Sequence, residues 1–131
     1  MAAGQAQKEF FVNEALCRAD ALLHPAAAGV ANDPPLAPEE GESWLVGAEP
    51  TGVWAAHPGQ LATFSGGWVF AEPRDGMRLL DRSTGQHILY RNGWQRPAAP
   101  AEPSGGETVD NEARAAITAL IGALISGGIL A

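Results

Sequence analysis

The segments LATFSGGWVF, residues 61–70, and HILYRNGW, residues 87–94, decide the fold class of this chain. Each contains an aromatic residue, three turn-forming residues and a tryptophan, in the same order. Apolar, aromatic and β-branched residues on both sides of such a turn are typical of a β-hairpin. We expect Gly67 and Gly93 to supply the positive φ angles that tight turns require.

Further short apolar runs surround these two segments between residues 41 and 97. Aromatic and β-branched residues between glycine-rich turns are found at residues 44–46, 53–54, 61–64, 68–70, 77–80 and 87–90. A third hairpin is expected at Arg82 to Gln86. No helix-length pattern interrupts this region, so residues 41–97 predict a small antiparallel β domain, a hairpin meander of about five or six strands.

An amphipathic helix is expected before the β domain, in residues 1–25. Its apolar residues, which include Val12 and Leu16, recur at helical spacing. Pro25 ends the helix, because the residue before a proline is disfavoured in helical conformation. The proline-rich residues 26–40 then predict an extended loop.

Phe10 and Phe11 exceed what one stripe of this helix can bury. Two alternatives stay open for these rings. Either both rings cover the β domain of their own chain, or part of the helix faces a partner chain.

A second helix is expected in residues 110–131, after a proline- and glycine-rich linker in residues 98–109. Asp110 is placed to cap it, and Gly127-Gly128 to end it. A helix this apolar either folds back on the β domain or assembles with copies of itself, and its four-three apolar spacing favours an oligomerisation helix. The candidate oligomer interface consists of Ile117, Leu120, Ile121, Leu124 and Ile125, together with Val12 and Leu16.

All four tryptophans lie in the β region, and their placement has two interpretations. Large aromatic residues in a small β domain usually form its core. Tryptophan and tyrosine beside exposed turns are also typical of a sugar-binding surface, because an aromatic face covers the apolar face of a pyranose. The candidate ligand-binding residues are Trp94, Tyr90, Arg91, Asn92, Arg96 and Trp68.

The composition argues against several classes of function. Eight Lys and Arg against 15 Asp and Glu give a formal charge of −7, which disfavours nucleic-acid binding and a membrane-surface role. The single cysteine, Cys17, cannot form a disulfide within the chain, and the three histidines are too widely spaced to indicate a metal site. We expect no cofactor. No apolar stretch reaches the length of a membrane span, and the first eight residues lack the apolar core of a signal peptide.

An enzymatic function is not expected. Glycoside hydrolysis requires two carboxylates across a sugar bond, but nothing in the spacing of the acidic residues selects a pair from Glu42, Glu72, Asp75 and Asp81. The serines in glycine turns lack a nucleophile elbow. A glycan hydrolase therefore remains a minor alternative.

Several blocks of the chain resemble a phage-derived family of unknown function, frequent in prophages and gene transfer agents of alphaproteobacteria. The blocks are residues 4–9 (GQAQKE), 12–16 (VNEAL), 19–22 (ADAL), 41–47 (GESWLVG), 51–54 (TGVW), 67–70 (GWVF) and 73–76 (PRDG). Residues 110–130 resemble the terminal helix of many fibre and spike proteins. The resemblance covers nearly the whole chain, and the opening block is its most specific part.

The resemblance implies a structural protein of a virion-like particle, in a tail fibre or head spike that contacts the host envelope. It brings no catalytic residues. It implies a homo-oligomer, with a trimer favoured, that is assembled in the cytoplasm with other particle proteins and contacts host capsular polysaccharide. A free carbohydrate-binding module is the alternative.

Overall fold

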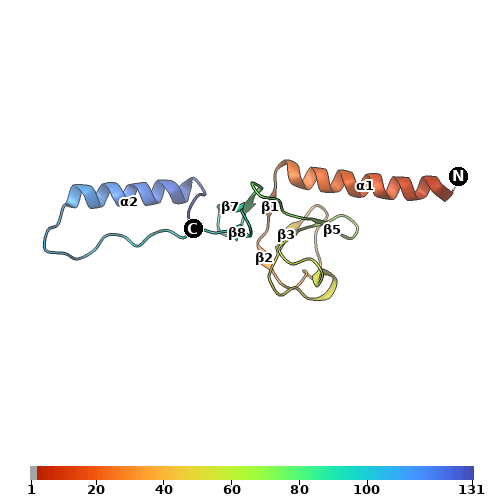
Figure 1. Ribbon diagram of the computed structural model, residues 1–131, viewed down its shortest axis with the longest axis horizontal. Helices are drawn as coiled ribbons and strands as arrows, with labels where there is room; N and C mark the ends of the chain where they lie inside the picture. Colours follow the sequence, from red (N-terminus) through yellow and green to blue (C-terminus); the bar gives the residue numbers. More distant parts are fainter. Residues whose placement is uncertain (1–2) are drawn as a thin grey trace.

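The structure, a computed structural model, describes residues 3–131, so Met1 and Ala2 of the expected first helix lie outside the described residues. The elements in chain order are α1 (Ala3–Leu23), β1 (Ala26–Ala27), β2 (Val30–Ala31), β3 (Ser43–Val46), the 3₁₀ turn η1 (Gly52–Trp54), β4 (Leu61–Phe64), β5 (Trp68–Ala71), β6 (Arg78–Asp81), β7 (Gln86–Tyr90), β8 (Trp94–Gln95) and α2 (Asn111–Ser126). Helices at both ends and strands between them confirm the α+β class (Figure 1).

The strands form two four-stranded mixed sheets, ordered β1-β6-β7-β8 and β2-β3-β4-β5. In each sheet three strands form an antiparallel meander, and a two-residue strand pairs in parallel with the first of them. The prediction of a purely antiparallel domain with five or six strands is therefore wrong in two respects. Residues 3–131 contain eight strands, and two of the strand pairs are parallel. The sequence pattern missed β1 and β2 because two residues are too short for any alternation to show.

The segment from Pro25 to Ala31 connects the two sheets, where we expected only an extended loop. The Leu80 N–H donates to Pro25 O at 2.9 Å on one side, and the Leu45 N–H donates to Gly29 O at 3.0 Å on the other. One short stretch of backbone thus belongs to both sheets and fixes their separation.

The three expected hairpins form. Their turns are closed by the cross-strand pairs Phe64–Trp68, Asp81–Gln86 and Tyr90–Trp94. In the first turn the positive φ belongs to Gly66, at 63°, rather than to Gly67. The middle residue of the three-residue turn takes the left-handed conformation here, as Asn92 does in the last hairpin, with a φ of 49°.

Residues 53–54 were expected to form a strand, but they are part of η1. The Trp54 N–H donates to Thr51 O at 3.1 Å, which closes a single 3₁₀ turn. This turn directs the Trp54 indole onto one face of the β2–β5 sheet, where it is fully buried.

The core has two parts, because the pleat sends alternate residues of β3–β5 to opposite faces. The inner cluster lies between the sheets and consists of Ala27, Leu45, Leu61, Ala71, Leu79 and Ile88. The outer cluster lies under η1 and consists of Val46, Trp54 and Ala62, with Ala31, Trp44, Trp68 and Phe70 packed against it.

The helix α1 packs on β4 and β5 with its more polar face. The residues that are half-buried there are Glu14, Cys17, Arg18 and Ala21. Val12 and Leu16 lie on the opposite face and are 56% and 62% exposed. Phe10 and Phe11 are each about two-thirds exposed as well, so the β domain covers neither ring fully.

The chain from Pro97 to Gly128 forms an arm that leaves the β domain and returns to it (Figure 1). No helix or strand is assigned between residues 96 and 110 of the described chain. The Asp110 carboxylate then accepts from the Ala113 N–H at 2.9 Å, which confirms the expected cap of α2. The Arg114 guanidinium donates to Gly105 O, so the outgoing linker stays beside the returning helix.

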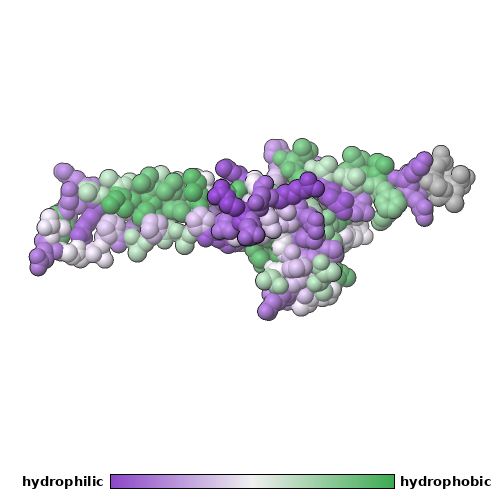
Figure 2. All heavy atoms as spheres, in the orientation of Figure 1, coloured by the Kyte–Doolittle hydropathy of each residue, from purple (hydrophilic) through white to green (hydrophobic). Residues whose placement is uncertain are grey.

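No residue of α2, all of which the structure describes, is buried. Ile117, Leu120 and Ile125 are 45%, 59% and 44% exposed, while Ile121 and Leu124 are half-buried. Figure 2 shows hydrophobic residues along α2, with a mostly hydrophilic surface over the centre of the molecule. The helix therefore does not fold back onto the sheets.

Among residues 3–131, neither helix combines the length and the apolar character that crossing a bilayer requires.

The end of the arm depends on Gly128. Its φ is 71°, and a Cβ there would lie 2.9 Å from Gly85 O and from His87 Nδ1. We expect Gly128→Ala to lower the free energy of unfolding by more than about 1 kcal/mol, from the strained backbone and the clash together. Gly122→Ala is the matched control inside α2, where a new Cβ meets nothing within 4 Å.

The control substitution should raise helix stability by up to about 1 kcal/mol. Urea unfolding of both variants checks the pair. Equal effects at the two positions would contradict the docked position of Gly128.

Candidate functional site

The structure separates the candidate ligand-binding residues into three places. Tyr90, Arg91, Asn92 and Trp94 share the β7–β8 hairpin. Trp68 lies at the start of β5, in the other sheet. Arg96 lies beyond β8 and its guanidinium turns back to Asp81 at 2.5 Å.

Trp94 connects the two sheets. Its Nε1–H donates to Gly59 O at 2.8 Å, in the loop before β4, and its ring packs against the inner cluster. The Tyr90 ring meets it edge to face, with 5.2 Å between the centroids. These contacts give the Trp94 ring a structural role, while a binding role for the exposed Arg91 and Asn92 stays a prediction.

Replacing Trp94 tests that structural role. Trp94→Ala removes the hydrogen bond to Gly59 and the packing, so we expect a loss of about 3 kcal/mol and a melting temperature several degrees lower. Trp94→Phe keeps an aromatic ring but loses the hydrogen-bond donor, so its melting temperature should lie between those of the wild type and Trp94→Ala. A melting temperature unchanged in Trp94→Ala would place this side chain outside the core.

Asp81 organises the β6–β7 turn. Its carboxylate accepts from the Ser83 N–H at 2.9 Å and from the Ser83 hydroxyl at 2.6 Å, and Arg96 binds its other oxygen. Burial alone raises the pKa of this carboxyl, but the hydrogen bonds from Ser83 and Arg96 outweigh burial and lower the pKa below its usual value. Arg96 thus has a structural role, because its guanidinium binds the Asp81 carboxylate.

The lowered pKa of Asp81 predicts an acid-dependent stability. The stabilisation is complete above the unfolded pKa, about 3.9, and is lost as the pH falls through the lower folded pKa. The difference in unfolding free energy between the wild type and Asp81→Asn should therefore be constant from about pH 7 to 5 and shrink below about pH 4. Urea unfolding at several pH values measures it, and a difference that grows on acidification would contradict the lowered pKa.

Two of the other acidic residues of the hydrolase alternative accept hydrogen bonds within the chain. Glu42 accepts from Trp44 Nε1 at 2.6 Å, and Asp75 accepts from the Asn92 N–H at 2.9 Å. Glu72 is exposed at the rim of a cleft described below. Within residues 3–131, no group of three or more His, Cys, Asp or Glu side chains is arranged to hold a metal ion.

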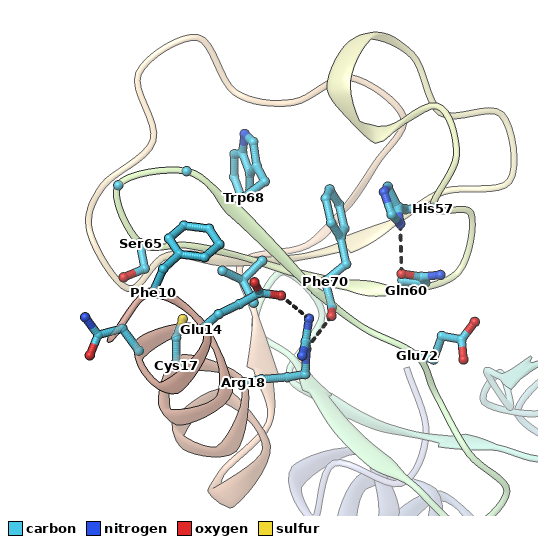
Figure 3. A pocket seen from close by; sticks show the side chains of 14 residues that line it. Phe10, Glu14, Cys17, Arg18, His57, Gln60, Ser65, Trp68, Phe70 and Glu72 are labelled. Atoms are coloured by element: carbon cyan, nitrogen blue, oxygen red, sulfur yellow. Dashed lines mark hydrogen bonds and ion pairs between the residues drawn. The ribbon is translucent and has the colours of Figure 1, made fainter. Parts of the chain in front are cut away.

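A cleft of about 680 Å³ lies between α1 and the β4–β5 hairpin (Figure 3). Its volume is within the usual range of small-molecule sites. Side chains from α1, from the loop before β4 and from the β4–β5 hairpin with the residue that follows it line the cleft, namely Phe10, Asn13, Glu14, Cys17, Arg18, His57, Gln60, Ser65, Trp68, Val69, Phe70 and Glu72.

Arg18 fixes one side of the cleft. Its Nε–H donates to Phe70 O at 2.8 Å, and its Nη2 binds Glu14 Oε1 at 2.5 Å. The first contact attaches α1 to β5, and the second pairs the positive charge of the guanidinium with the Glu14 carboxylate of the same helix.

The other side of the cleft is a stacked pair of rings. The His57 imidazole lies flat on Phe70, with 3.6 Å between the centroids and 5° between the planes. The His57 Nδ1 and Gln60 Oε1 are 3.1 Å apart, within hydrogen-bonding distance. Figure 3 shows the Trp68 and Phe70 rings projecting to the same side of β5, from alternate positions of the strand.

Among the residues of this cleft, the sequence pattern predicts Trp68 as a binding candidate, and it indicates that Phe10 exceeds what the apolar stripe of its helix can bury. Arg18, His57 and Gln60 are not predicted by any sequence pattern. Three separate segments supply the lining residues, and no local spacing predicts that such segments meet. The one available signal was a pair of aromatic residues at the helix start in excess of its apolar stripe.

Comparison with known proteins identifies a family. Residues 12–96 match the family described as "Protein of unknown function (DUF2793)". The match spans well over half of the chain, so the chain belongs to this family. No curated protein and no solved structure matches it significantly.

Proposed function

We propose that this member of the DUF2793 family is a non-enzymatic structural subunit of a phage-like or gene-transfer-agent-like particle. It acts in a head spike or tail fibre, where it assembles the appendage and attaches it to the host surface. It is assembled in the cytoplasm as a homo-oligomer, with a trimer favoured, and joins other particle proteins. The residue blocks described above support the phage-derived origin.

The uncovered apolar face of α2 is the observation that carries this proposal. Ile117, Leu120 and Ile125 are each about half exposed or more, although the arm holds the helix in place. Moving a fully exposed Leu or Ile side chain into a fully buried position contributes roughly 1.5–3 kcal/mol, and about half of that contribution is still available from each of these half-exposed side chains. The three together favour association with copies of the same helix, whose four-three spacing is suited to a helical bundle.

A second apolar face supports the same arrangement at the opposite end of the molecule. Val12 and Leu16 lie on the side of α1 that faces away from the sheets. Figure 1 shows α1 and α2 extending in opposite directions from the β domain. An elongated subunit with an exposed apolar helix face at each end suits an appendage, and the β domain between them remains available to the host surface.

The oligomeric state of single variants tests the proposal. Leu120→Glu places a charge on the apolar face of α2, and we expect it to reduce the mass measured by light scattering to that of a smaller species. Ala119→Glu is the matched control, since it introduces the same charge at the neighbouring exposed position on the other side of the helix. An oligomer that survives Leu120→Glu, or one that both variants dissociate equally, would contradict assembly through this face.

A further inference from the structure

We propose that the cleft between α1 and the β4–β5 hairpin binds a neutral sugar chain. This inference deepens the host-attachment part of the proposed function and rests on it. It assigns the contact to the cleft lined by Phe10 and by Trp68, one of the sequence-predicted binding candidates, and not to the β7–β8 hairpin that carries most of those candidates.

The aromatic residues of the cleft are suited to pyranose rings. Trp68 is half-buried and held from two sides, by Trp54 at 5.0 Å and by Phe64 at 5.3 Å between centroids. A ring fixed in this way offers apolar surface with little loss of side-chain entropy on binding. Phe10 stands on the other wall, on α1, and is 66% exposed. Sugar C–H faces are apolar, so they pack against such rings while the hydroxyl groups stay hydrated.

Polar groups around these rings match sugar hydroxyls. Asn13 on α1 and Gln60 before β4 supply amides, and Glu72 supplies an exposed carboxylate. Gln60 Oε1 faces His57, so its amide N–H groups remain for a ligand. Amides and carboxylates together donate to and accept from hydroxyls, which are both donors and acceptors.

The charge of the cleft favours a neutral ligand over an acidic one. Arg18 is the one lysine or arginine among the described lining residues, and Glu14 and Phe70 O already engage it. Glu14 and Glu72 add negative charge, and the whole chain carries a formal charge of −7. A uronate or sulfated sugar would be repelled here, since among the described lining residues no lysine or arginine is left unpaired to offset its charge.

Two neighbouring phenylalanines give a matched experiment. Phe10 lines the cleft and Phe11 does not, yet they are 66% and 65% exposed and contact each other. Each alanine variant removes one exposed phenylalanine side chain from α1. The probes are maltohexaose, cellohexaose, mannohexaose and a β-1,4-galactohexaose, with hexagalacturonate as the acidic comparison, and titration calorimetry of the full chain measures binding.

We expect at least one neutral hexasaccharide to bind saturably and hexagalacturonate to bind at least tenfold more weakly. Phe10→Ala should weaken that binding at least tenfold, while Phe11→Ala stays within twofold of the wild type. No binding of any neutral probe, equal losses in both variants, or preference for hexagalacturonate would overturn the inference. Light scattering on the same samples reports the oligomeric state, so a failure of sugar binding is distinguished from a failure of assembly.

Discussion

The buried amide of Gln86 holds both ends of the arm, and the position of α2 depends on it. Its Nε2 donates to Pro97 O at 2.7 Å, where the linker leaves, and to Ile129 O at 3.0 Å, where the chain returns. The His87 N–H adds a bond of 2.6 Å to Gly128 O. With both ends fixed at β7, the helix runs outward beside its linker, and its apolar face stays away from the sheets.

The β domain that carries the arm is built from two similar halves. Each half is an antiparallel meander with a two-residue parallel strand at its edge, and Pro25 to Ala31 serves both. Trp94 adds a second connection, from β8 to Gly59 before β4. The same two connections place the loop with His57 and Gln60 opposite α1, so the cleft follows from the way in which the sheets are joined.

Local patterns predicted the parts of this fold that local interactions determine. The hairpins at Phe64 to Trp68 and Tyr90 to Trp94 and the Asp110 cap follow from turn and capping preferences within a few residues. The parallel strands β1 and β2 pair with residues far away in the sequence and left no such pattern. Helical spacing showed that Val12 and Leu16 share a face, but the polar anchor from Arg18 to Phe70 O decided which face docks. The cleft escaped prediction for the same reason, because long-range contacts bring its walls together.

Sedimentation equilibrium of the unaltered chain, over a range of concentrations, tests the central claim most directly. We expect a mass about three times the 13.6 kDa of the single chain at micromolar concentration, because the helices that their own β domains leave uncovered hold the copies together. A single species of 13.6 kDa across the whole range would contradict it.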